Sequence, residues 1–363
     1  MNTLDASAKL WTSEWCRALG FLDGVPTWFY FFLALVFTYC FVVIPSGSVL
    51  SYLDRKLSAD LQARVGPNQA GPAGILQPIA DFLKLLQKQS TEKSNWREDV
   101  WLSIHTMALY STLAVMPLGT FALMLDTEMS AFLPFWSALV LALGTMLLGF
   151  SQGTVPGWFG GMRIAAQTMA GSFPALMGLL CTGVRTGSFQ WSQLATIQGF
   201  SPLSWTVFSN PFQTIACLVF VTSGLVLSAT PPLDGGLSMS DIHGGVASQL
   251  HGRKYSLYRF GRFYVFFLWS VITVVLFLGA WILPLEVSRF LSDKGANRIL
   301  SILELILLLF KTFAVMLTVI WIARVNPRSR VDQITSLAWK VLSPFSLIAL
   351  VGASLWMGWR NLG

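Results

Sequence analysis

Two ionisable side chains, Glu304 and Lys311, lie within a stretch of the chain that is otherwise apolar. They are seven residues apart, about two turns of an α-helix, so a helix would present both on one face. Charges inside a membrane are costly and usually face a bundle interior or a water-filled cavity. The pair is therefore a candidate for coupling ion movement, and the alternative for Glu304 is a solvated position at the membrane boundary.

Arg163 separates two otherwise uncharged stretches. It either marks the end of a helix or belongs to a charged network within the membrane.

Metal and nucleotide sites are not predicted. The four cysteines form no CxxC pair, and the three histidines lack the spacing of metal ligands. There is neither a GxGxxG motif nor a Walker loop. We therefore expect this chain to bind no metal and no redox cofactor itself.

The composition is that of a membrane protein. Hydrophobic residues make up 54% of the 363 residues and charged residues 11%, against about 25% charged in soluble domains. These values exclude a soluble fold and predict an all-α integral membrane protein. We expect residues 1–25 to form an amphipathic surface segment of the mature protein, and residues 26–363 to form a single membrane domain.

Uncharged stretches long enough to span a bilayer, about 20 residues in a helix, predict eight transmembrane helices. The predicted helices lie near residues 27–50, 100–125, 131–153, 160–184, 211–229, 262–284, 301–323 and 338–358. An even number of helices places both termini on one side of the membrane.

The Lys and Arg side chains predict the orientation. Fourteen lie in or beside the loops 51–99, 230–261 and 324–335, and seven lie on the opposite face. By the positive-inside rule the three loops face inward and both termini face outward. The net charge of +7 is thereby explained by topology, so no nucleic acid is expected as a partner.

The loop 51–99 is too long for a turn. Ile75, Ile79, Phe82, Leu83 and Leu86 fall on one helical face and polar residues on the other. This pattern predicts an amphipathic helix that lies on the membrane surface or under a partner subunit.

The same loop carries a dense motif. It reads Asp54-Arg55-Lys56, Gln62-Ala63-Arg64-Val65-Gly66-Pro67-Asn68, Gly71-Pro72 and Leu76-Gln77-Pro78-Ile79-Ala80-Asp81. Further motifs are Gly160-Gly161-Met162-Arg163 with Ala165-Ala166-Gln167, and Pro327-Arg328-Ser329-Arg330-Val331-Asp332-Gln333. From about residue 26 to the end, the chain resembles the quinone-site membrane subunit of respiratory complex I, known as the H subunit in bacteria and as subunit 1 in mitochondria.

This resemblance implies a subunit of an NADH:quinone oxidoreductase that holds no redox centre of its own. It would form the quinone entry tunnel and the junction between the peripheral redox arm and the ion-pumping membrane arm. Quinone would be the substrate, with iron–sulfur clusters and flavin in partner subunits. The implied partners are the peripheral-arm iron–sulfur and quinone-site subunits, small membrane subunits, antiporter-like subunits and lipid.

Matching the motifs by position assigns candidate residues. The resemblance places these in the tunnel and its charged network: Asp54, Arg55, Gln62, Arg64, Asp81, Lys84, Arg328, Arg330 and Asp332. The candidates for coupling are Arg163, Asp234, Asp241, Glu304 and Lys311. The alternative for each arginine is binding of lipid phosphate or a purely topological role.

The chain departs from the family at its acids. Family glutamates fall here at Leu237, Met239, Asp241, Gln249 and Arg262, and another acid falls at Ser172. Only Asp241 keeps a carboxylate, while Arg253, Lys254, Arg259 and Arg262 bring positive charge to the same stretch. We therefore expect a retained tunnel with an altered acidic relay.

Two alternatives follow. The chain is a divergent complex I subunit, or it is the homologous anchor of a related hydrogenase or another ferredoxin-linked ion-pumping complex. A stand-alone transporter is less favoured, because the two halves show no internal repeat. The predicted location is an energy-coupling membrane, with the bacterial inner membrane preferred over the mitochondrial one.

Overall fold

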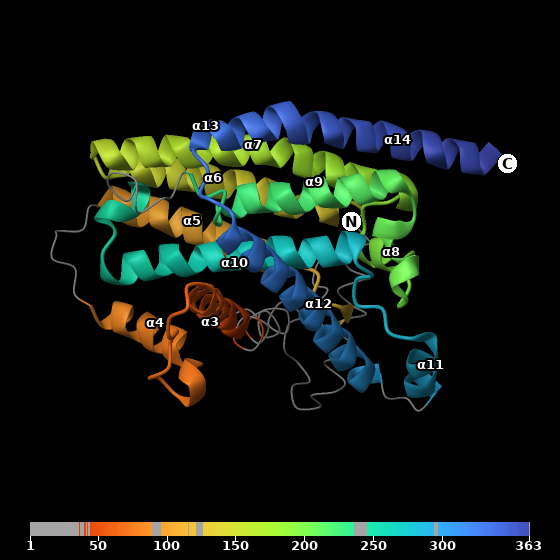
Figure 1. Cartoon of the computed structure of the whole chain (residues 1–363), viewed down its shortest axis with the longest axis horizontal. Helices are drawn as coiled ribbons and strands as arrows, with labels where there is room; N and C mark the ends of the chain where they lie inside the picture. The colour runs from red at the N-terminus through yellow and green to blue at the C-terminus, as the bar shows by residue number, and fades with distance from the viewer. Residues whose placement is uncertain are drawn as a thin grey trace, which may run out of the picture.

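The computed structural model describes residues 44–88, 96–114, 116–120, 126–235, 245–293 and 297–362, together with Val36, Cys40 and Val42. All regular elements in these ranges are helices (Figure 1). The predicted surface segment 1–25, most of the first predicted span and Asp241 lie outside the described residues.

Six segments of the described chain are long and apolar enough to cross a membrane. They are Ser130–Ser151, Val155–Thr186, Pro211–Ser228, Gly252–Phe277, Ile299–Val325 and Val331–Arg360. Each coincides with one of the eight predicted spans. The complete set of eight therefore stays a prediction, and so does the division into a surface segment and one membrane domain.

The helices of the bundle run side by side (Figure 1). α5 (Trp96–Ala114), α6 (Leu133–Ser151) and α7 (Val155–Thr186) pack in sequence, and α9 (Pro211–Ser228) contacts α7. α14 (Ser343–Leu362) lies over α7 and α9. Short helices complete the connections, namely η4 (Ser130–Phe132), α8 (Trp191–Thr196), η5 (Pro202–Ser204), η6 (Thr206–Phe208), α11 (Leu285–Asp293), α13 (Val331–Leu337) and η8 (Ala338–Leu342).

α10 (Gly252–Phe277) occupies the centre of the bundle. Within the most apolar 18 residues of α10, 83% are buried, whereas only 28% are buried in the most apolar 18 residues of α12 (Asn297–Val325). Every residue of the Phe266–Phe277 segment is buried, and all are apolar except Ser270 and Thr273, whose hydroxyls donate to carbonyl oxygens of the same helix. α12 crosses this bundle obliquely and contacts α10 and α3 (Ile44–Leu61) (Figure 1).

Of the helices that extend beyond their predicted ends into the predicted inner loops, α3 and α10 extend furthest. α3 continues through Asp54 and Arg55 to Leu61, although hydropathy predicts that the loop begins at residue 51. α10 begins at Gly252 rather than near residue 262. In α3 the Asp54 carboxylate pairs with Arg324. In α10 Lys254 pairs with Glu98, and Arg262 lines a cavity. The helices therefore continue through charged residues where hydropathy alone predicts a loop.

α4 (Gln77–Gln87) covers the segment where the sequence predicts an amphipathic helix. Phe82 packs edge-on against Phe260 of α10, with ring centroids 5.0 Å apart. Ile79, Leu83 and Leu86 are exposed. Burial of α4 against a membrane surface or a partner subunit stays a prediction.

Candidate functional site

An ion pair joins α3 to the end of α12. Both Nε and Nη2 of Arg324 donate to Oδ1 of Asp54, at 3.1 and 2.5 Å, and Nη2 lies 2.6 Å from Oδ2. The two residues are 270 positions apart in the chain. The forked contact fixes the ends of two helices against each other, because a guanidinium binds a carboxylate best through two nitrogens.

A second ion pair joins the loop after α9 to the loop after α12. Nε and Nη2 of Arg328 donate to Oδ1 and Oδ2 of Asp234 at 2.8 and 2.6 Å. Asp234 is only 2% exposed. Its carboxylate is therefore screened little by solvent, and its interaction with Arg328 is stronger than that of a surface pair.

The buried side chain of Gln167 holds this loop in place. Its Nε2 donates to the carbonyl oxygens of Val226 and Leu233, at 2.8 and 2.6 Å. Ser329 N also donates to the Pro232 carbonyl at 2.9 Å. The glutamine of the α7 motif thus positions Asp234 by fixing the residue before it.

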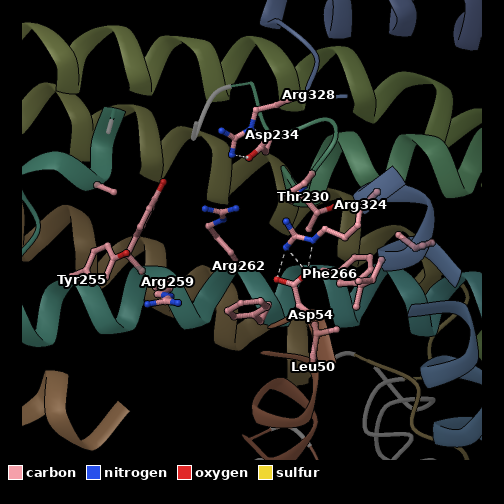
Figure 2. A pocket seen from close by; sticks show the side chains of 17 residues that line it. Leu50, Asp54, Thr230, Asp234, Tyr255, Arg259, Arg262, Phe266, Arg324 and Arg328 are labelled. Carbon is pink, nitrogen blue, oxygen red and sulfur yellow. Dashed lines mark hydrogen bonds and ion pairs between the residues drawn. The ribbon is translucent and has the colours of Figure 1, made fainter. Parts of the chain in front are cut away.

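Between the two ion pairs lies a cavity of about 360 Å³, which we call the arginine-lined cavity (Figure 2). Its polar lining residues are Asp54, Thr230, Asp234, Tyr255, Tyr258, Arg259, Arg262, Arg324 and Arg328. Its apolar lining residues are Leu50, Pro231, Ala247, Phe263, Phe266, Val319, Ile320 and Ala323. The cavity therefore offers charged hydrogen-bond donors together with an aromatic and aliphatic wall.

Arg259 and Arg262 enter this lining from α10. Arg262 points away from the helix into the cavity (Figure 2), and its Nη2 donates to the Ala229 carbonyl at 3.2 Å. Its Nε is buried and has no hydrogen-bond partner among the described residues. Sequence reasoning assigned neither arginine to the site, although their spacing of three residues places them on one helical face.

The charged residues of the first loop form a separate group around α4. Nη1 of Arg55 lies 2.6 Å from Oδ2 of Asp81, and Gln77 Nε2 donates to Oδ1 at 3.1 Å. Burial alone would raise the pKa of Asp81. The hydrogen bonds from Arg55 and Gln77 and the charges of Arg55 and Arg259 outweigh it, so the pKa lies below its usual value.

Other predicted tunnel residues lie outside the cavity lining. Arg64 is exposed and its Nε donates to Gln62 Oε1 at 2.7 Å. Lys84 is exposed on α4. Arg330 and Asp332 are at the start of α13, where the Asp332 carboxylate lies in the first turn of the helix.

The predicted coupling residues are dispersed. Arg163 is exposed on α7. The hydroxyl of Thr120 donates to Glu304 Oε2. Nζ of Lys311 donates to the carbonyl oxygens of Leu278, Gly279 and Ala280, at 3.0, 3.0 and 3.1 Å.

Lys311 therefore satisfies carbonyl groups beyond the end of α10, where the helix supplies no donors. It also lies 5.1 Å from the ring centroid of Trp205. Of the predicted coupling residues that the structure describes, Asp234 alone lines the arginine-lined cavity.

A metal site would need several suitable side chains close together. In the described ranges no group of three or more His, Cys, Asp or Glu side chains could hold a metal ion.

Comparison with known proteins identifies similar chains. A family model described as NADH dehydrogenase matches residues 33–354. The chain is 27% identical to the H subunit of NADH-quinone oxidoreductase from Anaeromyxobacter dehalogenans (strain 2CP-C), over 87% of this chain and 80% of that protein. It is 29% identical to the corresponding protein of Chlorobaculum tepidum, over 95% of this chain and 97% of that protein.

A solved structure shares the fold. It comes from a study of the membrane-bound sulfane sulfur reductase, an archaeal respiratory membrane complex. The TM-score is 0.76 at 21% identity, and the match covers 89% of this chain and 99% of that one.

Proposed function

Because the chain belongs to the NADH dehydrogenase family, as a complex I-like membrane subunit similar to the H subunit of NADH-quinone oxidoreductase, we propose that its arginine-lined cavity receives a quinone headgroup. The chain would then form the membrane-side part of the quinone tunnel. The electrons would come from iron–sulfur clusters and flavin in partner subunits. The chain would serve the oxidoreductase without holding its redox centre.

One observation carries this proposal, namely the mixed lining of the cavity. A quinone headgroup has two carbonyl oxygens that accept hydrogen bonds, and its isoprenoid tail needs an apolar surface. Guanidinium groups meet the first need, and the side chains of Phe263, Phe266 and Ile320 meet the second. Leu50 and Val319 extend the apolar wall along α3 and α12.

The same arrangement supports a role at the junction of two arms. α4 exposes Ile79, Leu83 and Leu86, and the side chains of Lys84 and Lys88 beside them are exposed as well. An exposed apolar face beside charged loops suits a peripheral subunit docked on the membrane domain. The charged network of Arg55, Arg64, Asp81, Arg330 and Asp332 would lie at this junction rather than inside the cavity.

The acidic relay of the family would be altered. Arg262, at a position where the resemblance implies a glutamate, points into the cavity. Ser172, at a position where the resemblance implies another acid, donates a hydrogen bond to the Met169 carbonyl of its own helix. The proton route would then depend on the remaining acids, of which Asp54 and Asp234 line the cavity and Glu304 lies on α12.

A cavity-filling substitution tests the quinone site. Ala323 lines the cavity and is 8% exposed, so Ala323→Leu should narrow it. In the purified complex we expect the KM for quinone to rise at least fivefold, with the complex still assembled. Ala314→Leu on the exposed face of the same helix is the matched control and should leave KM unchanged. An unchanged quinone KM in Ala323→Leu would contradict the proposal.

The loss of the family's acids is the one observation that favours a second candidate, a complex other than an NADH:quinone oxidoreductase. A different electron acceptor or a different ion would require a different relay. In that case the chain would anchor a hydrogenase-like or other ferredoxin-linked assembly. Mass spectrometry of subunits that copurify with the tagged chain separates the two. Partners with a nickel–iron site and no quinone reduction would support the alternative, and inhibitor-sensitive quinone reduction would support the first proposal.

A further inference from the structure

The arginine-lined cavity holds more positive than negative charge. Four guanidinium groups and two carboxylates line it. Arg324 binds the Asp54 carboxylate and Arg328 binds the Asp234 carboxylate, each through two nitrogens at 3.1 Å or less. Within the described parts of the chain, this leaves Arg259 and Arg262 without a carboxylate inside the cavity.

Surrounding elements supply little compensation for Arg262. Its Nη2 contacts a neutral carbonyl oxygen, that of Ala229, and its Nε is buried without a partner in the described residues. A smaller cavity of about 50 Å³ also borders Arg262, and it is lined by neutral or apolar groups and His105 but no carboxylate. Arg262 is half-buried, and a charge partly removed from water is unfavourable unless a counter-charge reaches it.

Arg259 has a partial counter-charge outside the cavity. Its positive charge contributes to the lowered pKa of Asp81. Asp81 is itself bound by Arg55 at 2.6 Å. Arg262 is therefore the less compensated of the two positive charges. Arg259 lies one helical turn away and adds to the positive potential in the cavity.

We propose that the arginine-lined cavity binds a phosphate-type oxyanion against Arg262. Guanidinium groups present planar forks of N–H donors that match the oxygens of phosphate, and they stay charged at all working pH values. The orphan Nε of Arg262 supplies a donor that already faces away from water. The Thr230 hydroxyl adds a neutral polar group to the same lining.

Two sources of phosphate fit this chemistry. Free phosphate would occupy the charged end alone. The headgroup of an anionic phospholipid would do so while its acyl chains lie along Phe263, Phe266 and Val319. Oxyanion binding does not require the quinone proposal, but a regulatory effect rests on it, because an anion at Arg262 would compete with the headgroup for one cavity.

Direct binding to the purified, delipidated complex tests the site. The probes are radiolabelled inorganic phosphate in equilibrium dialysis, and phosphatidylglycerol against phosphatidylcholine in native mass spectrometry. We expect one saturable site per complex, at least tenfold weaker in Arg262→Gln and unchanged in Arg253→Gln. Arg253 is exposed in the first turn of α10 and lies outside the cavity lining, so it is a matched control.

The outcomes separate the sources. Saturable phosphate binding that Arg262→Gln weakens supports free phosphate, and selective retention of phosphatidylglycerol alone supports a lipid headgroup. Arg262→Lys keeps the charge but loses Nε and the planar fork of donors, so its binding should lie between that of the wild type and that of Arg262→Gln. Such intermediate binding guards against a folding defect as the cause of the loss in Arg262→Gln. Absence of saturable binding for both probes, or equal binding by wild type and Arg262→Gln, would overturn the proposal.

Turnover measurements keep this test apart from that of the quinone site. Phosphate, compared with chloride at equal ionic strength, should raise the KM for quinone in the wild type and not in Arg262→Gln. If Ala323→Leu leaves the quinone KM unchanged while phosphate still binds at Arg262, the quinone proposal fails and the oxyanion site stands. If Ala323→Leu raises the quinone KM and no anion binds, the oxyanion proposal fails and the quinone proposal stands.

Discussion

Asp234 shows how one buried carboxylate depends on one distant partner. It is almost fully buried, and Arg328 binds both of its oxygens from a loop 94 residues further along the chain. Removing one member of such a pair leaves an uncompensated charge, whereas removing both can restore much of the lost stability. The pair is therefore best examined by a double-mutant cycle.

We predict that Arg328→Gln destabilises the protein by about 3 kcal/mol because it strands the Asp234 carboxylate. Asp234→Asn combined with Arg328→Gln should recover a clear part of that loss. The measurement is the thermal denaturation of the purified complex, followed for all members of the cycle. Simple addition of the two single losses would show that the two side chains are not coupled.

Asp81 makes a prediction about pH. Its pKa is lowered, so its contribution to stability is fully present above the unfolded-state value of about 4 and is lost as the pH falls through the folded-state pKa. Asp81→Asn should increase hydrogen exchange of α4 at pH 7 by a few fold, since a partly exposed pair contributes up to about 1 kcal/mol.

This difference in α4 exchange should shrink as the pH is lowered below about 4. Asp332→Asn, at the start of α13, is the control and should leave α4 exchange unchanged. A difference in α4 exchange that persists in acid would mean that Asp81 acts through its shape and not through its charge.

At the scale of elements, the close contact between α7 and η7 (Gly245–Gln249) requires a glycine at position 160, because there is no room for a Cβ atom. A Cβ on Gly160 would lie 2.7 Å from Gly245 Cα and 2.7 Å from Val246 N. Both are backbone atoms, so neither can move aside by a rotamer change. Ala247, in the middle of η7, lines the arginine-lined cavity.

We predict that Gly160→Ala displaces η7 and destabilises the protein by about 1–3 kcal/mol, the usual range for overpacking. Thermal denaturation measures the loss, and hydrogen exchange locates it at residues 245–249. Gly358→Ala is the control, because no heavy atom lies within 4 Å of the added Cβ. Equal stability of Gly160→Ala and the wild type would contradict the close approach.

Helix ends follow the same logic of satisfied backbone groups. Lys311 and Gln198 both serve the segment after α10, since Gly279 N donates to Gln198 Oε1 at 2.7 Å while Lys311 donates to three carbonyl oxygens. Buried polar backbone needs such partners. The contacts give Lys311 a structural role, and its proposed part in coupling stays a prediction.

At the scale of the whole molecule, burial separates the centre from the periphery. α10 is buried on nearly all sides. In the Val331–Arg360 span, which includes α14, only 28% of the most apolar 18 residues are buried. α14 exposes Phe345, Ile348, Val351, Leu355 and Trp359. In a membrane these side chains would meet lipid or neighbouring subunits.

The charge distribution predicts the orientation of this last helix. The loop that carries Arg324, Arg328 and Arg330 should face inward, and the C-terminus should face outward. Alkaline phosphatase fused after Gly363 should therefore be active, and green fluorescent protein at the same place should be dark. A cysteine at Ser329 should react only with reagents that cross the membrane. A fluorescent C-terminal fusion would reverse the assigned orientation.

Sequence alone determined the features that depend on local composition. Apolar length predicted the six spans that the described residues contain, because crossing a membrane requires about 20 apolar residues in a row. The motifs around Asp54, Gly160 and Arg328 identified the family, which the matching family model confirms. These features persist in any arrangement of the helices, so they can be read without the fold.

Tertiary structure decided which charges meet. Asp54 and Asp234 are predicted site residues, but their pairing with Arg324 and Arg328 depends on how α3, α10 and α12 cross. The sequence marks Arg262 only as a lost acid, and the packing turns it into the centre of a cavity. Long-range pairing follows from the geometry of packed helices, which hydrophobic periodicity does not encode, and this is why the arginine-lined cavity could be seen only in the fold.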